Sequence, residues 1–224
     1  RWLPHLDHYA VEVLRLQGRG DIVEYTCGRC SEHLIDGVGF RCDDCFDTRL
    51  CCKECCVALH SRLPLHRIQH WTGNHFQPIQ LKSMGLYCQL GHVDGQRCAS
   101  ATHLDSFIVL DVTGIHEVSI CFCGCEGAPE HSVQLLRQRW WPATFRDPRT
   151  AATFQLLDHF DILCGQSPLS AVSGPDYYRH LVHLTDNVGA NPPPVRRPII
   201  TICMMSLVSL VRVLRTDCCL LKSW

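Results

Sequence analysis

Three pairs of cysteines with C-x-x-C spacing are the residues of this sequence best suited to do chemistry. The pairs are Cys27/Cys30, Cys42/Cys45 and Cys52/Cys55, and the histidines His60 and His66 follow them. A C-x-x-C turn presents two thiolates to one ion, and zinc takes four cysteine or histidine ligands in a tetrahedron. Three pairs together with two histidines therefore predict two complete zinc sites.

The spacing of these residues resembles the ZZ-type cross-brace zinc finger, in which the first and third pairs share one zinc ion. Eleven residues separate the first pair from the second, six separate the second from the third, and five separate the two histidines. The segments GFRCDDC at 39–45 and HRIQHW at 66–71 resemble that finger too. The resemblance implies one ion on Cys27, Cys30, Cys52 and Cys55, and a second ion on Cys42, Cys45, His60 and His66.

One spacing departs from that finger, because ZZ fingers usually have one residue fewer between the second and third pairs. Cys51 is therefore a competing thiol next to Cys52. Cys52 keeps the two-residue gap to Cys55, which favours it over Cys51 as the ligand. Cys56 is then a spare thiol.

A disulfide framework is the alternative interpretation, since many cysteines in a short secreted chain usually form bridges. The sequence has no apolar signal segment near its start, and its 17 cysteines are odd in number. Paired C-x-x-C turns are also more typical of a reducing cellular compartment than of an oxidising one. We therefore expect a nuclear or cytoplasmic protein that is not secreted.

Length and charge exclude several classes of protein. The 224 residues have room for one or two small globular domains. With 21 basic and 22 acidic residues the formal net charge is -1, so no overall field attracts nucleic acid or an anionic membrane. The apolar run at 199–211 is shorter than the ~20 residues of a transmembrane helix and is followed by Arg212. We expect no membrane partner.

The apolar pattern predicts an α+β fold: a small zinc-stabilised finger, a short-stranded β unit and a C-terminal helical segment. Residues 3–16 predict an amphipathic helix that packs against the zinc module. Apolar runs at 76–81, 86–90, 107–112 and 116–123 predict strands. Helices are predicted to begin near Pro129, Thr150 and Ser173. The predicted segments are the N-terminal helix at 1–23, the finger at 24–72, the β unit at 73–128, the helical segment at 129–189 and an unmatched tail at 190–224.

Two aromatic pairs in the helical segment, Trp140-Trp141 and Tyr177-Tyr178, are expected in the core rather than in a base-stacking platform.

The predicted β unit also carries six candidate ligands, which is more than one zinc ion needs. They are Cys88, His92, Cys98, Cys121, Cys123 and Cys125.

The chain resembles the second CxC-type cysteine-cluster domain that accompanies KDZ transposases, a group common in fungal genomes. Nine segments match in order between about Leu3 and Gly189. They are LRLQGRGD at 14–21, FRCDDCF at 40–46, LHRI at 65–68, LGH at 90–92, GIHEV at 114–118, FCGC at 122–125, WPAT at 141–144, PRTA at 148–151 and LTDN at 184–187. Residues 171–175 look like a short insertion, and the sequence after Gly189 does not match.

The resemblance implies a third zinc ion on His92, Cys98, Cys123 and Cys125. At the positions of Cys88 and Cys121 the family usually has an apolar or polar residue in place of a cysteine.

In that family the chain would continue into a DDE-type RNase H-like catalytic domain, so we expect this chain to be a truncated copy. Deleting residues 190–224 is expected to leave the thermal midpoint unchanged.

The implied function is a non-catalytic zinc-binding accessory domain of a KDZ-type transposase. A zinc hydrolase or a RING-like ubiquitin ligase is the alternative, yet four ligands close each predicted site and no H-E-x-x-H is present. A non-functional transposon remnant is a third interpretation, which expression of the transcript would test.

The charges of the predicted finger indicate which class of partner it binds. Between Cys27 and Trp71 it carries six basic and six acidic residues. Asp43, Asp44 and Asp47 cluster around the second pair, where a cation such as a peptide amine would be received. A basic face could instead form from Arg41, Arg49, Arg62 and Arg67. We expect a protein or chromatin partner, or the missing transposase domain, in preference to direct DNA binding, and no small-molecule substrate.

Overall fold

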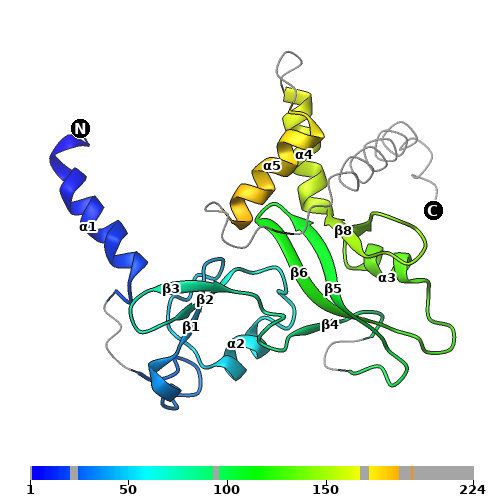
Figure 1. The fold of residues 1–224 in the computed structure, drawn as a ribbon, viewed down its shortest axis with the longest axis horizontal. Coiled ribbons are helices and arrows are strands. Elements are labelled where there is room, and N and C mark those ends of the chain that lie inside the picture. The colour runs from blue at the N-terminus through cyan, green and yellow to red at the C-terminus, as the bar shows by residue number, and fades with distance from the viewer. Residues whose placement is uncertain (1, 21–24, 93–95, 167–171, 187–192, 194–224) are drawn as a thin grey trace, which may run out of the picture. The chain divides into compact units, whose positions relative to one another are not determined.

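The computed structural model describes residues 2–20, 25–92, 96–166, 172–186 and 193 (Figure 1). The chain divides into two compact units, residues 1–86 and residues 87–224, which are described one at a time. The predicted tail at 190–224 lies outside the described residues except for Pro193.

Unit 1 is the finger together with the segments that flank it. Its elements are η1 (Leu3–His5), α1 (Leu6–Gln17), η2 (Ile35–Gly37), β1 (Phe40–Cys42), α2 (Lys53–Leu59), β2 (Ile68–Trp71) and β3 (Phe76–Ile79). The three strands form an antiparallel sheet in the order β1-β2-β3. The strand at 76–79, which the sequence analysis assigned to the β unit, thus pairs with the finger, and Leu81 and Leu86 pack in the finger's core with Leu50 and Ile68.

Helix α1 confirms the helix predicted over residues 3–16, but none of its residues is buried. Leu6, Val13 and Leu14 are all at least half exposed. The helix is tied to the finger at its C-terminal end, where the Arg41 guanidinium donates hydrogen bonds to the carbonyl oxygens of Leu16 and Gly18. Among the described residues, the prediction that its apolar face packs against the zinc module is therefore wrong.

Unit 2 contains a five-stranded mixed sheet with helices beside it. Its elements are β4 (Tyr87–Gln89), β5 (Thr102–Asp111), β6 (Gly114–Phe122), α3 (His131–Arg137), β7 (Trp140–Pro142), β8 (Thr150–Thr153), α4 (Phe154–Gln166) and α5 (Gly174–Thr185). The strand order is β4-β6-β5-β8-β7. The long hairpin β5–β6 forms the centre, with β4 parallel to β6 and β8 parallel to β5. The predicted α+β fold class is confirmed.

The predicted helical segment contains two strands that the sequence analysis missed, β7 and β8. Thr150 was predicted to cap a helix, but it is the first residue of a buried strand that pairs with Ile108. Helix α4 is capped three residues later by Thr153, whose Oγ1 accepts a hydrogen bond from the Leu156 N–H. The start of α5 was predicted correctly, since the Ser173 hydroxyl caps it by accepting from the Asp176 N–H.

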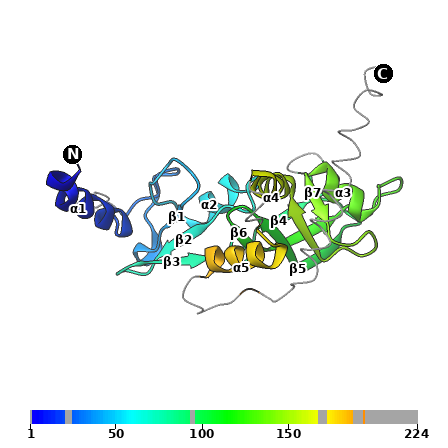
Figure 2. The ribbon, with the colours of Figure 1, turned by 90° about the horizontal axis from the view of Figure 1, so that it is seen from above.

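The core of unit 2 lies between the sheet and the helices α4 and α5, and Figure 2 shows both helices beside the strands. Ile108, Leu110 and Ile115 of the hairpin pack against Leu156 and Leu157 of α4 and against Tyr177, Tyr178 and Leu181 of α5. Trp140, Tyr177 and Tyr178 are buried, as expected of core residues. None of the described helices combines the length and the apolar composition that a membrane span requires.

Candidate metal centres

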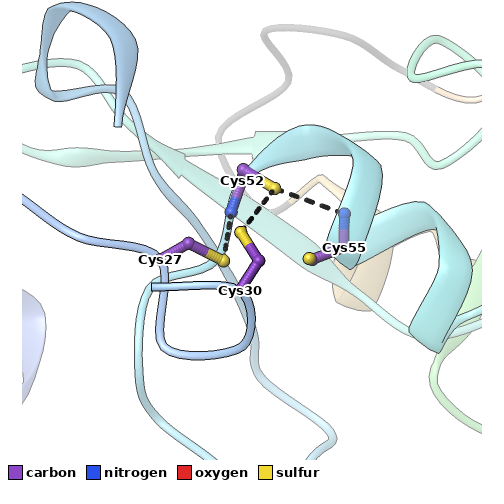
Figure 3. A group of neighbouring side chains, drawn as sticks. All are labelled: Cys27, Cys30, Cys52 and Cys55. Carbon is purple, nitrogen blue, oxygen red and sulfur yellow. Dashed lines mark hydrogen bonds between the residues drawn. The ribbon is translucent and has the colours of Figure 1, made fainter. Parts of the chain in front are cut away.

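The first cluster lies where the turn Cys27–Cys30 faces the start of helix α2 (Figure 3). The side chains of Cys27, Cys30, Cys52 and Cys55 point toward one centre, and their sulfur atoms all lie within 4.8 Å of one another. Cys30 Sγ and Cys52 Sγ are 4.0 Å apart. The Cys52 N–H donates to Cys27 Sγ over 3.2 Å, and the Cys55 N–H donates to Cys52 Sγ over 3.4 Å. Cys52 is thus both a cluster residue and the cap of α2.

The backbone around Cys27 favours its thiolate form. Burial opposes the charge, but hydrogen bonds from the N–H groups of Cys30, Cys52 and Arg29 outweigh it and lower the pKa of Cys27 to about 6. The turn is tied to the next loop, because the Gly28 N–H donates to the Leu50 carbonyl over 2.8 Å. A Cβ at Gly28 would lie 2.8 Å from the Arg49 Cβ, so this close approach requires glycine.

The second cluster joins Cys42 and Cys45, at and after the end of β1, with two histidines that follow α2. His66 Nδ1 lies 3.3 Å from Cys42 Sγ and 3.4 Å from Cys45 Sγ. His60 Nε2 lies 3.6 Å from Cys45 Sγ. His60 is 3% exposed and its Nδ1 lies 2.7 Å from the Cys56 carbonyl oxygen. Because a carbonyl only accepts, Nδ1 carries the proton, which leaves the Nε2 lone pair to face the cluster.

An ion pair clamps the two halves of the second cluster together. Asp44, in the turn between Cys42 and Cys45, accepts a hydrogen bond from the Arg67 N–H over 2.6 Å and another from the Arg67 guanidinium over 2.6 Å. Burial raises the pKa of Asp44, but these bonds outweigh it and hold the pKa below its ordinary value. Arg67 directly follows His66, so the pair fixes the histidine relative to the cysteine turn.

The third cluster lies in unit 2, where the loop after β4 meets the end of β6. His92 Nε2 is 3.1 Å from Cys123 Sγ and 3.6 Å from Cys125 Sγ. Cys98 Sγ is 3.8 Å from Cys123 Sγ and 3.6 Å from Cys125 Sγ. Hydrogen bonds from the Gly124 and Ser100 N–H groups lower the pKa of Cys98 to about 6 against the effect of burial. One thiolate is therefore favoured by the backbone here, as in the first cluster.

The spacing of the donor atoms fits a tetrahedral metal ion in each cluster. Bonds of about 2.0–2.3 Å from zinc to nitrogen or sulfur place neighbouring ligand atoms about 3.3–3.8 Å apart. The sulfur–sulfur distances above run from 3.6 to 4.0 Å and the sulfur–nitrogen distances from 3.1 to 3.6 Å. The three clusters could hold metal ions.

All twelve residues proposed from the sequence lie in these clusters, four to each and in the grouping that the resemblances implied. That they bind metal stays a prediction. The competing cysteines lie elsewhere: the Cys51 thiol donates to the Phe40 carbonyl in the core, and Cys121 Sγ lies 3.0 Å from His103 Nδ1. Cys56 and Cys88 are buried outside the clusters. None of the fourteen cysteines in the described part of the chain forms a disulfide.

Sequence reasoning missed three residues that hold these clusters in place. Arg67 clamps the second cluster, and Gln89 Oε1 accepts a hydrogen bond from the Cys98 N–H over 3.2 Å in the third. Gln134 hydrogen bonds to the backbone of Cys123. Asp44 and Arg67 stood out as charges, but nothing in the sequence pattern marks Gln89 or Gln134.

Comparison with known proteins identifies the family of one part of the chain. Residues 81–189 match the family described as a CxC2 like cysteine cluster associated with KDZ transposases. This confirms the predicted resemblance for the stretch that contains the third cluster, whereas the first two clusters precede the matched residues. No curated protein and no solved structure matches the chain.

Proposed function

We propose that this chain, whose residues 81–189 are a CxC2-like cysteine cluster of the kind associated with KDZ transposases, is a zinc-binding accessory domain of such a transposase. The observation that carries the proposal is the set of three clusters, each with four cysteine or histidine donors at tetrahedral spacing. Their compositions are Cys₄, Cys₂His₂ and Cys₃His. These soft donor sets are those of structural zinc sites.

The proposed role is non-catalytic. A catalytic zinc site has three protein ligands and leaves one position for water or substrate, whereas each cluster here offers four. The His116-Glu117 pair, which could suggest hydrolytic chemistry, lies outside the three clusters, and His116 Nε2 is 2.8 Å from the Thr113 hydroxyl. These features support a structural use of the metal. They give no support to a hydrolase.

We further propose a protein or chromatin partner in preference to direct DNA binding. Three of the four arginines that could form a basic face are engaged within the finger. Arg49 pairs with Asp47 and Arg67 pairs with Asp44. Arg41 donates to Gln69, Leu16 and Gly18 and lies 3.5 Å over the Phe76 ring. Phosphate binding would have to compete with these contacts.

The same ion pairs refine the expected cation site around the second cysteine pair. Asp44 and Asp47 are neutralised by their arginines, so Asp43 is the aspartate of the three that carries no side-chain ion pair among the described residues. A partner would therefore meet a nearly neutral surface, on which Phe46 is fully exposed. This supports recognition of a protein surface more than of a highly charged tail. Fourteen described cysteines without a disulfide support a nuclear or cytoplasmic location.

Duplex DNA of random sequence tests the choice of partner. The zinc-loaded chain, residues 1–224, is titrated with labelled DNA at several salt concentrations, and we expect no binding even at low salt. The double substitution Asp44→Asn and Asp47→Asn provides the matched control, because it frees Arg49 and Arg67 and should give weak, salt-sensitive binding. Micromolar affinity of the unmodified chain with a steep salt dependence would reject the proposed preference.

A further inference from the structure

The side chain of Gln134, on helix α3, is buried beside the third cluster and hydrogen bonds to one of its residues. Its Oε1 accepts from the Cys123 N–H over 2.9 Å. Its Nε2 donates to the carbonyl oxygens of Cys123 and Pro129, each over 2.9 Å. Gln134 is 1% exposed, so its carboxamide depends on these three bonds.

The same face of α3 makes a second contact at the end of β6. His131, three residues before Gln134, stacks on Phe122 with the ring centroids 4.0 Å apart and the planes at 8°. Side chains three residues apart lie on one face of a helix. Helix α3 therefore docks on two successive residues, Phe122 at the end of β6 and the candidate ligand Cys123.

Gly91 shows how closely Gln134 fits into the cluster. A Cβ at Gly91 would lie 2.7 Å from the Cys123 Cβ and 2.9 Å from Gln134 Oε1. Gly91 directly precedes His92, whose Nε2 lies 3.1 Å from Cys123 Sγ. Gln134 thus packs where the two chain segments that carry the cluster approach each other, and a displaced side chain would alter the position of Cys123 relative to His92.

We infer that Gln134 is a positioning residue for the third metal centre and that, through it, metal occupancy controls the docking of α3. The inference rests on the proposed zinc function. Gln134 holds both polar groups of the Cys123 backbone, and this sets the direction in which Cys123 Sγ faces His92 and Cys98. Linkage is reciprocal. Metal binding that orders Cys123 therefore stabilises the docked α3 by the same free energy by which a docked α3 strengthens metal binding.

Zinc affinity provides the first test. The zinc-loaded chain, residues 1–224, and its Gln134→Leu variant are titrated with a chromophoric chelator that removes the ions in order of affinity. We expect three ions from the unmodified chain, and in the variant one ion bound ~10–100-fold more weakly with the other two unchanged. Ser132→Ala is the matched control, because the Ser132 hydroxyl is buried on the same helix and has no hydrogen-bond partner within the described structure. It should keep all three affinities.

The outcomes separate this inference from the proposed function. Three ions of unchanged affinity in Gln134→Leu would overturn the positioning role and leave the zinc sites standing. Two ions in the unmodified chain would overturn the third centre itself and the inference with it. If Gln134 served only to pack α3, Gln134→Leu would lower the thermal midpoint without lowering the affinity for any of the three ions.

Hydrogen exchange tests the coupling even where Gln134→Leu does not fold. The variant His92→Ala removes one donor of the third cluster and keeps Gln134. We expect the amides of residues 131–138 to exchange at least tenfold faster in this variant than in the unmodified zinc-loaded chain. Unchanged exchange in α3 would overturn the inference.

Discussion

His60 Nδ1 donates a hydrogen bond to the carbonyl oxygen of Cys56 over 2.7 Å, and Cys56 lies one turn earlier on helix α2. The bond orients the His60 ring so that Nε2 faces the second cluster. The opposite end of α2 carries Cys52 and Cys55 of the first cluster. This seven-residue helix therefore connects the two clusters, and disturbance of either one should reach the other.

The first prediction separates ligand cysteines from spare ones. Cys52→Ser and Cys42→Ser should each lose one zinc ion per chain and most ordered structure of the finger, because structural zinc supplies folding energy of ~10–16 kcal/mol. Cys51→Ser should keep every ion, since its side chain donates to the Phe40 carbonyl and serine can do the same. Metal analysis of the purified variants measures this. Loss of an ion in Cys51→Ser, with none lost in Cys52→Ser, would reverse the assignment.

The second prediction concerns two glycines of unit 2 with the same backbone conformation. Gly91 and Gly127 both have a φ of 76°, but a Cβ at Gly91 would meet Cys123 whereas one at Gly127 would have nothing within 4 Å. Each alanine substitution should cost ~1–2 kcal/mol of folding free energy for the left-handed backbone. Gly91→Ala should in addition weaken the third zinc ion at least tenfold. Equal zinc affinity in the two variants, measured by chelator competition, would contradict the packing of Gly91 against the cluster.

The third prediction compares two ion pairs of the finger. Asp44 is largely shielded and receives both the backbone N–H and the guanidinium of Arg67, whereas Asp47 and Arg49 form an exposed pair. Asp44→Asn should lower the free energy of unfolding by about 1–3 kcal/mol, because it weakens charge-assisted bonds. Asp47→Asn should change it by less than about 1 kcal/mol. Denaturant unfolding of the zinc-loaded chains provides the comparison, and a larger effect at Asp47 would refute the clamp.

The fourth prediction follows from the exposure of helix α1. Deleting residues 1–17 should shift the thermal midpoint by no more than a few degrees, because none of the residues of α1 is buried. The C-terminal attachment through Arg41 is weak in comparison with a packed face. A drop of ten degrees or more would show that the apolar side of α1 contributes to the stability of the finger.

The clusters could be anticipated from the sequence because each C-x-x-C turn brings its own two thiols together. The choice between Cys51 and Cys52 also has a local physical basis. Neighbouring residues of extended backbone point in opposite directions, so Cys51, which is bridged to Phe40, faces the core while Cys52 faces the cluster. The α+β fold class could also be predicted, because the spacing of apolar residues indicates helices in some segments and strands in others.

The missed features depend on contacts that are distant in the sequence. Strand β8 has the sequence Thr-Ala-Ala-Thr, whose two alanines are unfavourable in strands and which shows no apolar alternation, and it forms where the chain pairs with β5. Trp140–Pro142 lies in the predicted helical segment at 129–189, but it forms strand β7 because it pairs with β8. Gln134 stands on an ordinary helical face, and only the fold places it next to Cys123.

The metal stoichiometry of the unmodified chain tests whether the three clusters bind zinc. Native mass spectrometry of residues 1–224, purified under reducing conditions, should show three zinc ions per chain. Removing them with a chelator should abolish most of the ordered structure in the circular dichroism spectrum, and adding zinc back should restore it. A chain that contains no zinc, or that remains fully folded without it, would show that the three clusters are not structural zinc sites.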